Sequence, residues 1–294
     1  MLPIQLWIKS VSRKEKMMDK FYILANLQKD EKLQVTEEIE KYLKAAGATV
    51  TTDISNHISS EKIPKDTQCI LVIGGDGTFI RAAHGVLKTN IPMLGVNLGT
   101  LGYLTEVETS QIYPALDRVL SDEYTVEERM MLEGTTPPHH QGAQKAVAFN
   151  DVVITRAGKL RTVEYRIYVN GEYLHSYKAD GVIVATPTGS TGYNLSAGGP
   201  IVKPSASSIV ITPICPHTLN TRSIVLDGND HICVEIGPGR KEESETAEAV
   251  FDGDSTFHLK SGEAVHIARA ESTVKMLKLS QISFLETLRR KLGE

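Results

Sequence analysis

The sequence predicts two differently built halves. The first is an α/β N-terminal domain with a doubly wound parallel sheet, and the second is a β-rich, sandwich-like C-terminal domain, so that the chain is α+β as a whole. Strand and helix signals alternate from residue 21 to about residue 131, which is the pattern of a parallel sheet covered by helices. From about Glu133 onward, many short strands follow with turn signals and almost no helix. The 294 residues are ample for two domains.

The first half shows strands and helices in turn. The segment Asp30 to Ala46 has apolar residues at helical spacing and ends at Gly47, as helices commonly do. Cys69 to Ile73 is a continuous apolar run, which is typical of a parallel strand covered on both faces. The other expected strands are Phe21–Leu27, Ala48–Thr52 and Ile91–Val96, and the other expected helices are Phe79–Leu87 and Ile112–Leu120.

The second half shows strands only, until a last helix. Asn170-Gly171 between two alternating segments is a strong hairpin signal within Tyr165 to Tyr177. The other expected strands are Val147–Thr155, Val182–Ala185, Ser208–Thr212, Ser223–Leu226, His231–Ile236, Ala249–Asp252 and Ala264–Ala268. The helical pattern of residues 280–292 is expected to pack back onto the first half.

These patterns place the α/β domain at residues 17–131 and the β-rich domain at residues 132–270. Residues 1–16 are expected to be a disordered N-terminal extension. Their apolar patch precedes the basic residues, the reverse of the order in a signal peptide.

Composition narrows the class of protein further. The net charge of −4 gives no basic footprint for nucleic acid, and no apolar stretch is long enough to span a membrane. Cys69, Cys215 and Cys233 stand singly in apolar runs, which favours reduced core cysteines. A cytoplasmic protein is the expectation.

One apolar run stops abruptly at the GGDGT sequence of residues 74–78. In open α/β sheets, the turn that follows a strand is where ligands bind. Glycines there let the backbone approach a ligand and leave N–H groups free for phosphate. Asp76 lies among these glycines, where a carboxylate can do proton work or organise a metal. The plainer alternative is a Gly/Asp turn between a strand and a helix.

The second half carries a dense polar segment from Asp180 to Pro200, DGVIVATPTGSTGYNLSAGGP. A strand ends at Pro187, and the hydroxyls and glycines that follow suit ribose, amide and phosphate groups. The alternative is a loop that caps the start of a helix.

Two further polar positions interrupt apolar strands. Asn150 and Asp151 break the run from Val147 to Ile154. Because an unpaired buried polar group is costly, they either cap a turn or bind something polar, and we favour binding. For Asp252-Gly253-Asp254, a hairpin turn and a site are equally favoured.

Three common motifs are missing. The sequence has no GxxxxGK[ST] loop, no GxGxxG after a strand and no GxSxG elbow. It therefore indicates neither a P-loop enzyme, nor a dinucleotide-binding Rossmann half, nor an α/β-hydrolase.

The motifs, taken in order, resemble the NAD kinase family. The resemblance rests on GGDGT at 74–78, NLGTLGYL at 97–104, the pair at 150–151 and the segment 180–200, and also on ITPICPHTL with NTR at 211–222. The first motif is shared with phosphofructokinases and with diacylglycerol and sphingosine kinases. TPTGSTGY at 186–193 followed by SAGGP at 196–200 is far more specific. The resemblance covers residues 21–268.

The resemblance implies transfer of the γ-phosphoryl group of ATP to the adenosine-ribose 2′-hydroxyl of NAD, giving NADP. The reaction would require a divalent metal ion, for which Mg²⁺ is the first expectation. Asp76 would orient or deprotonate that hydroxyl. A second role, pairing with Mg²⁺, stays open. No direct protein cage is expected for the metal, because the ATP phosphates would hold it.

The resemblance also implies the substrate contacts. Asn150 and Asp151 would hydrogen-bond the riboses, and Asp180 would meet the nicotinamide amide. The family more often has Asn-Glu at 150–151, which leaves Asp151 one methylene shorter, and some relatives have His at position 253, where this chain has Gly. The expected contacts are Gly74, Gly75, Gly77, Thr78, Arg81, Tyr103, Asn150, Asp151, Lys178, Asp180, Thr188, Thr191, Tyr193, Ser196, Cys215 and Asp252.

By the same resemblance, NAD lies between the domains, and the β-rich half assembles a homodimer or homotetramer in which a neighbour often completes the site. The runner-up enzyme is a lipid or sugar kinase of the same GGDGT superfamily, against which the segment 186–200 argues. A third reading is a silent NAD-binding regulator, against which the intact Asp76 argues. Polyphosphate as donor and NADH as acceptor stay open.

Overall fold

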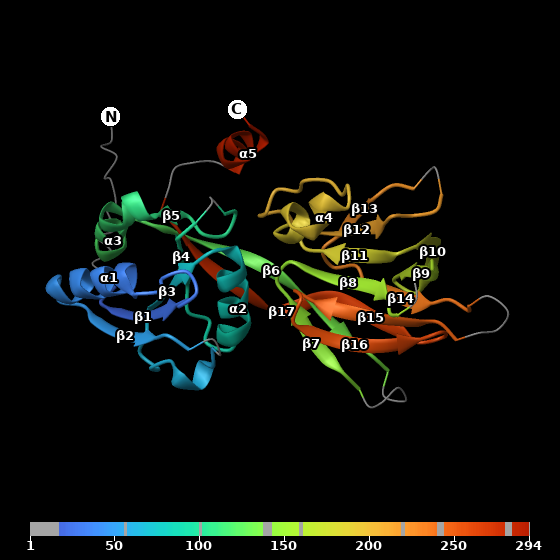
Figure 1. The fold of residues 1–294 in the computed structure, drawn as a ribbon, viewed down its shortest axis with the longest axis horizontal. Coiled ribbons are helices and arrows are strands. Elements are labelled where there is room, and N and C mark those ends of the chain that lie inside the picture. Colours follow the sequence, from blue (N-terminus) through green and yellow to red (C-terminus); the bar gives the residue numbers. More distant parts are fainter. Residues whose placement is uncertain are drawn as a thin grey trace, which may run out of the picture.

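The computed structural model describes residues 18–55, 58–99, 102–137, 143–158, 161–218, 221–239, 244–279 and 284–293. The predicted extension at residues 1–16 lies outside these ranges. Figure 1 shows an elongated molecule in which a helix-rich half and a strand-rich half lie end to end.

The first half contains the predicted parallel sheet. Its strands lie in the order β2 (Thr49–Asp53), β1 (Lys20–Ala25), β3 (Cys69–Gly74), β4 (Met93–Asn97) and β5 (Val107–Glu108), and every neighbouring pair is parallel. All six residues of β3 are buried. The prediction of a parallel strand covered on both faces is therefore confirmed.

Helices cover both faces of this sheet, so the doubly wound prediction is confirmed. On one face lie α1 (Gln34–Ala45) and α3 (Ile112–Leu120), whose Ile39 and Leu116 pack with Leu71. On the other face lies α2 (Asp76–Val86), whose Phe79 packs with Val72. Leu71 and Val72 are neighbours on β3 and point to opposite faces, as in any strand. Two short 3₁₀ turns, η1 (Ser60–Lys62) and η2 (Thr109–Gln111), complete this half.

The helix expected from Asp30 begins four residues later, at Gln34. The Asp30 carboxylate accepts hydrogen bonds from the Thr36 backbone N at 2.9 Å and from Thr36 Oγ1 at 2.7 Å. Asp30 therefore precedes the helix and satisfies its first free N–H groups.

Two sheets packed face to face form the second half, as the sequence predicts. One is antiparallel throughout, in the order β13 (Ile224–Asp227), β12 (Ser208–Ile214), β11 (Gly181–Ala185), β8 (Asp151–Arg156), β15 (Thr246–Phe251) and β16 (Ser255–Lys260). The other contains β10 (Glu172–Ala179), β9 (Val163–Val169), β14 (Ile232–Ile236), β17 (Ala264–Lys278), β6 (Thr125–Thr135) and β7 (Lys145–Ala148). Val152 and Val184 of the first sheet share one core with Tyr165 and Val234 of the second. The turn η3 (Gly189–Thr191) and the short helix α4 (Tyr193–Ser196) follow β11.

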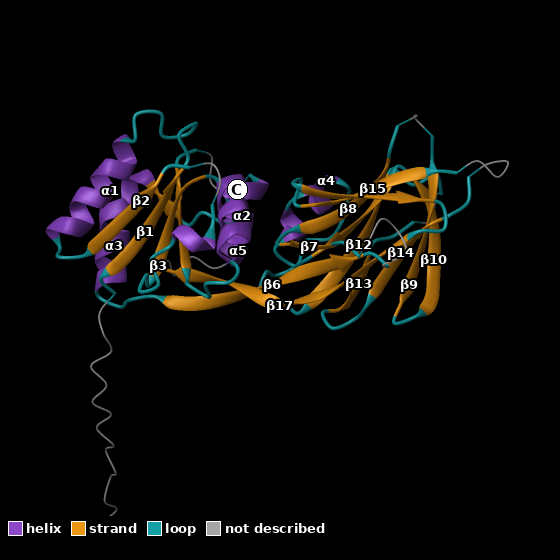
Figure 2. Ribbon diagram, turned by 90° about the horizontal axis from the view of Figure 1, so that it is seen from below, coloured by secondary structure: helices purple, strands orange, loops and turns teal. Residues whose placement is uncertain are grey.

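Two long strands run through both halves, which the sequence did not indicate. The strand expected at 264–268 continues to Lys278, and its partner β6 was not predicted. Near its start β17 pairs with β14, and near its end Met276 pairs with Met93 of β4. One 11-stranded sheet therefore joins the parallel sheet to the sandwich, and Figure 2 shows β6 and β17 bridging the halves. The boundaries expected at residues 131 and 270 fall inside these strands.

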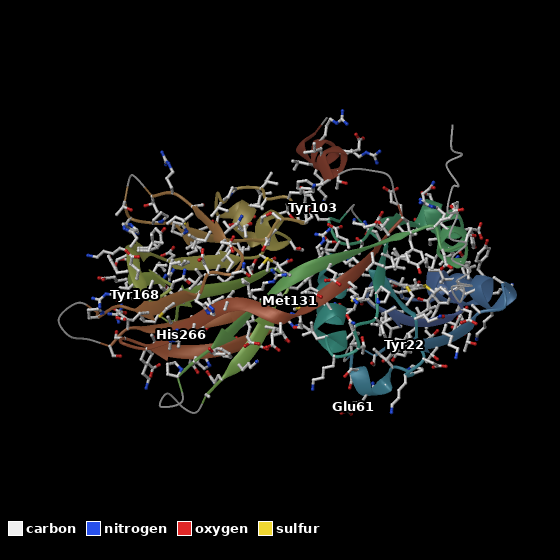
Figure 3. The ribbon with its side chains drawn as sticks, turned by 180° about the vertical axis from the view of Figure 1, so that it is seen from behind. Tyr22, Glu61, Tyr103, Met131, Tyr168 and His266 are labelled. Atoms are coloured by element: carbon white, nitrogen blue, oxygen red, sulfur yellow. The ribbon has the colours of Figure 1, made fainter. Side chains whose placement is uncertain are left out.

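The last helix lies over the junction of the halves (Figure 1). The helix α5 spans Phe284–Leu292, and residues 280–283 of the predicted helix lie outside the described ranges. Lys291 Nζ lies 4.3 Å from the ring centroid of Tyr103, which Figure 3 places below α5. No helix among the described residues has the length and hydrophobicity to cross a membrane.

Candidate active site

The GGDGT turn joins β3 to α2 at the carboxyl end of the parallel sheet. Gly74 ends β3 and Asp76 begins α2. A Cβ on Gly74 would lie 2.6 Å from Thr78 Oγ1, so this position accepts only glycine. Thr78 Oγ1 in turn accepts a 2.9 Å hydrogen bond from Asn26 Nδ2 at the end of β1. The turn is therefore fixed against two neighbouring strands.

The Asp76 carboxylate is held by the loop that follows β4. Its Oδ2 accepts a hydrogen bond from Tyr103 N at 2.8 Å, and its Oδ1 accepts bonds from Leu104 N at 3.1 Å, Thr105 N at 3.2 Å and Thr105 Oγ1 at 3.2 Å. A Cβ on Gly102 would lie 1.9 Å from Asp76 Oδ1. The two glycine-rich motifs of the first half thus meet at this carboxylate. Oδ2 receives one bond, which leaves it capacity to accept another.

Asn150 and Asp151 lie in the bend between β7 and β8, across the junction from α2. Asp252 holds this bend, because its carboxylate accepts the backbone N–H groups of Phe149 at 2.5 Å, Asn150 at 2.8 Å and Asp151 at 3.0 Å. The Asp252 side chain is 1% exposed, and its backbone φ is 49° at the turn from β15 to β16. Asp252 is a hairpin-turn residue, which was one of the two alternatives raised by the sequence, and it also supports the 149–151 bend.

The side chains of this bend lie in an unusual environment beside a cavity. Burial first, and the negative charge of Asp252 second, raise the pKa of the Asp151 carboxyl from its ordinary 3.8 to about 7. Asn150 Oδ1 is buried and has no hydrogen-bond partner. Both residues line a cavity of about 420 Å³ together with Ile80 of α2 and Tyr193 of α4. An unpartnered amide oxygen beside a cavity indicates a place where a ligand would donate a hydrogen bond.

The hydroxyl-rich segment folds tightly onto the same bend. A Cβ on Gly189 would lie 2.0 Å from the Asn150 carbonyl oxygen, and Thr186 N donates to that oxygen at 2.8 Å. Several hydroxyls bond within the protein: Thr186 Oγ1 to Phe149 O, Ser190 Oγ to Pro187 O and Thr191 Oγ1 to Thr188 O. These hydroxyls shape the loop, whereas Tyr193, 47% exposed, and the exposed Ser196 face outward.

Arg129 is a buried cation that the sequence did not single out. Its Nη1 donates to Thr188 Oγ1 at 3.3 Å and its Nη2 pairs with Glu127 at 3.0 Å. It therefore ties β6 to the hydroxyl-rich segment. It follows the polar residues Glu127 and Glu128, so no local pattern marked it as buried.

Three predicted contacts lie apart from Asp151: Asp180 and Cys215 at the other end of the antiparallel sheet, and Lys178 on β10 of the other sheet. Asp180 and Cys215 adjoin the start of β11 and the end of β12, whereas Asp151 pairs with Ala185 at the far end of β11. Five residues of strand separate the ends by about 16 Å. Asp180 Oδ1 accepts from Arg156 Nε at 3.2 Å, and the Lys178 carbonyl accepts from His217 N at 2.8 Å.

The prediction of core cysteines holds for one residue of the three. Cys69 is buried, Cys233 is half-buried and Cys215 is exposed, and all three are free thiols. Cys215 follows β12 with a φ of 46° and is exposed.

Comparison with known proteins identifies the family. The model of the ATP-NAD kinase N-terminal domain matches residues 56–124, and that of the ATP-NAD kinase C-terminal domain matches residues 149–279. An NAD kinase from Agathobacter rectalis is 48% identical over 284 residues, which cover 94% of this chain and 99% of that relative.

The chain belongs to the NAD kinase family.

Other family members agree in sequence and in fold. The NAD kinase from Lachnoclostridium phytofermentans is 45% identical, over 94% of this chain and all of that relative. Yeast NADH kinase, solved in complex with NADH, superposes with a TM-score of 0.81 at 25% identity, covering 95% of this chain and 89% of that one. An NAD kinase from Archaeoglobus fulgidus, solved in complex with ATP, superposes with a TM-score of 0.74 at 25% identity. The match covers 89% of this chain and 94% of that one. The family resemblance seen in the motifs is therefore confirmed.

His84 is a further polar residue in contact with Asp252 that the motifs did not indicate. It lies on α2, and its Nε2 is 2.7 Å from Asp252 Oδ2. A lone histidine within an apolar helix carries no signal of such a contact, because Asp252 lies 168 residues further along the chain.

Proposed function

We propose that this chain transfers the γ-phosphoryl group of ATP to the adenosine-ribose 2′-hydroxyl of NAD, giving NADP and ADP. Membership of the NAD kinase family and the structural likeness to kinases solved with ATP and with NADH support this activity. The observation that carries it is that Asp76, fixed among phosphate-facing glycines, lies on the helix that borders the cavity of Asn150 and Asp151.

Asp76 is the residue that handles the hydroxyl proton. In the transfer, the 2′-oxygen forms a bond to the γ-phosphorus while the bond from that phosphorus to the bridging oxygen of ADP breaks. The hydroxyl proton passes to Asp76 Oδ2, the oxygen with spare acceptor capacity. The bonds from the 103–105 loop keep the carboxylate in place, so that no reorganisation is needed when charge moves.

The dinucleotide is held by the second half. Asn150 Oδ1 accepts from a ligand hydroxyl or amine, and Asp151 bonds a ribose as acceptor or, when protonated, as donor. Tyr193, within the hydroxyl-rich loop, and Tyr103, after β4, each supply an aromatic face beside a cavity. The backbone N–H groups of Gly75 and Gly77, with Arg81 on the next turn of α2, face the donor phosphates.

The divalent cation enters with the nucleotide. Among the described residues, no group of three or more His, Cys, Asp or Glu side chains is arranged to hold a metal ion. The donor oxygens of ATP phosphates suit Mg²⁺, which keeps much of its water shell and takes few protein ligands. Mg²⁺ bound to ATP would neutralise charge on the transferred group.

Assembly accounts for the distant group of predicted contacts. Asp180 and Cys215 lie about a strand's length from Asp151, so we propose that they serve a dinucleotide bound mainly by a neighbouring copy. This fits a homodimer or homotetramer formed through the β-rich half. A cytoplasmic location, where thiols stay reduced, suits the three free cysteines.

The activity is tested by incubating the purified chain with ATP, Mg²⁺ and NAD and measuring NADP with an NADP-specific dehydrogenase. We expect ATP- and NAD-dependent formation of NADP. Parallel reactions replace ATP by polyphosphate, NAD by NADH, and NAD by a lipid or sugar acceptor. No phosphorylated dinucleotide with any donor or metal would refute the proposal, and transfer to a lipid or sugar would replace it.

A further inference from the structure

The helix that carries Asp76 also touches the support of the NAD-binding bend. His84 lies on α2, eight residues after Asp76, and its Nε2 is 2.7 Å from Asp252 Oδ2. Because a carboxylate accepts, Nε2 is the nitrogen that carries the hydrogen. The two side chains come from opposite halves of the molecule, α2 and the β15–β16 turn.

The Asp252 carboxylate has a full set of donors only when His84 is present. Oδ1 accepts from the backbone N–H groups of Asn150 and Asp151, and Oδ2 accepts from Phe149 N and from His84. The side chain is 1% exposed, so water cannot replace a missing donor without a local rearrangement. The position of Asp252, and of the bend it holds, therefore depends on α2.

An apolar contact accompanies this bond. The rings of Phe79 on α2 and Phe149 in the bend lie 6.3 Å apart, in the same core cluster. This contact brings α2 against the bend but fixes no direction, because apolar packing tolerates sliding. The hydrogen bond from His84 adds direction to the contact.

The contact of His84 with Asp252 sets the distance between Asp76 and the bend that carries Asn150 and Asp151. Asp76 begins α2, and His84 lies two turns on, about 12 Å along the axis. The backbone N–H groups of Asn150 and Asp151 donate hydrogen bonds to the Asp252 carboxylate. A shift of Asp252 would move both NAD-binding side chains relative to Asp76.

We propose that His84 is a positioning residue for phosphoryl transfer, which donates to Asp252 and thereby fixes the Asn150–Asp151 bend relative to Asp76. This inference rests on the proposed function. His84 acts through Asp252 and touches neither substrate nor the reacting atoms. Its contribution is the donated hydrogen bond, so a side chain that offers a donor at the same reach replaces it.

The test compares variants at position 84 that lack a donor with one that keeps it. His84→Ala and His84→Met remove the donor, and Met retains most of the volume. His84→Gln places an amide N–H near the position of Nε2. For each, kcat, KM for ATP, KM for NAD and the Kd of NAD without ATP are measured, together with the melting temperature.

We expect the variants without a donor to lose roughly 10- to 100-fold in kcat, since an ångström of misplacement is that costly. Their NAD Kd should rise, because the bend that His84 supports through Asp252 carries the dinucleotide contacts. KM for ATP should stay within about twofold, because the phosphate-facing turn at the start of α2 makes no bond to Asp252. His84→Gln should recover kcat to within about threefold of the wild type. As the matched control, His258→Ala removes an exposed histidine 3.5 Å from Glu248 on the same β15–β16 hairpin and should leave every parameter unchanged.

Wild-type kcat in a variant without a donor would overturn the inference. So would a His84→Gln protein as slow as His84→Met, because imidazole packing would then be the cause. If neither donor-free variant folds while His84→Gln folds and turns over normally, His84 stabilises the fold only, and the inference again fails. A wild-type chain that binds NAD but forms no NADP would refute the proposed function instead, and the NAD Kd series would still test the positioning role.

Discussion

Two carboxylates of the site lie in opposite surroundings. Asp76 accepts four hydrogen bonds from the 103–105 loop, whereas Asp151 is 6% exposed, lines a cavity and lies near the negative Asp252. We therefore expect Asp76 to work on a proton and Asp151 to exchange hydrogen bonds with a ligand. Such a division of roles by environment is common in enzymes that carry two acids.

The raised pKa of Asp151 predicts how the stability of the protein depends on pH. Between about pH 4 and pH 7, the unfolded chain releases a proton that the folded protein keeps. Stability contributed by this group is therefore complete at pH 4, falls as the pH rises toward 7 and is lost above it. Asn at position 151 stays uncharged at every pH, as the protonated carboxyl is. The free energy of unfolding of Asp151→Asn should therefore be about 2–4 kcal/mol higher than that of the wild type at pH 8.

The measurement is urea unfolding of the wild type and Asp151→Asn across pH 4 to 8. The difference between the two should shrink toward pH 4. Asp254→Asn, at an exposed position, serves as the control. Its difference from the wild type in the free energy of unfolding should not change in this way with pH. A constant difference across the range would contradict the assigned environment of Asp151.

The sequence indicated these residues but not their partners. GGDGT, Asn150-Asp151 and the segment 180–200 were recognisable because glycines and polar groups interrupt apolar runs. The donors to Asp76 come from 27 to 29 residues away, and those to Asp252 come from about 100 and 168 residues away. Contacts at such separations depend on the tertiary fold, and local patterns carry no record of them.

At the scale of elements, the first turn of α2 and the loop after β4 form one joint. Gly102 is the closest point, since any Cβ there would overlap Asp76 Oδ1. Glycine at position 102 therefore lets the loop after β4 approach the Asp76 carboxylate.

Gly102→Ala should displace the carboxylate and reduce kcat about 100-fold or more, because Asp76 would leave its productive position. Gly99→Ala lies in the same loop, where a Cβ meets nothing within 4 Å, and should keep near-normal kcat. Both variants are compared in the NADP assay. Equal activity of the two would mean that the geometry of this joint is unimportant.

The elements that sequence patterns predicted are those buried on one or both faces. The parallel strands and the helices above them have apolar runs or apolar stripes that reveal them. β6 begins with exposed and charged residues, and β17 changes register between Arg269 and Thr273, which interrupts its alternation. The sequence pattern of β6 and β17 was therefore a weak indication of strands, although these two strands determine how the halves are joined.

At the scale of the molecule, the two halves have separate tasks on a shared frame. Under the proposed function, the first half presents the turn with Asp76 to the donor phosphates, and the second half presents the bend with Asn150 and Asp151 to the dinucleotide. β6 and β17 run through both halves, and α5 lies above the junction (Figures 1 and 2). Chemistry and NAD binding should therefore be separable by substitution.

Asp76 is proposed to accept the proton of the NAD 2′-hydroxyl. Measuring kcat and the NAD Kd of Asp76→Asn tests this role, because the amide preserves the shape of the side chain and keeps one acceptor oxygen for the 103–105 loop. We predict that kcat falls by about 10²- to 10⁴-fold, while the NAD Kd stays within about threefold of the wild type. Turnover within about tenfold of the wild type, or a loss of NAD affinity that matches the loss of turnover, would contradict this account.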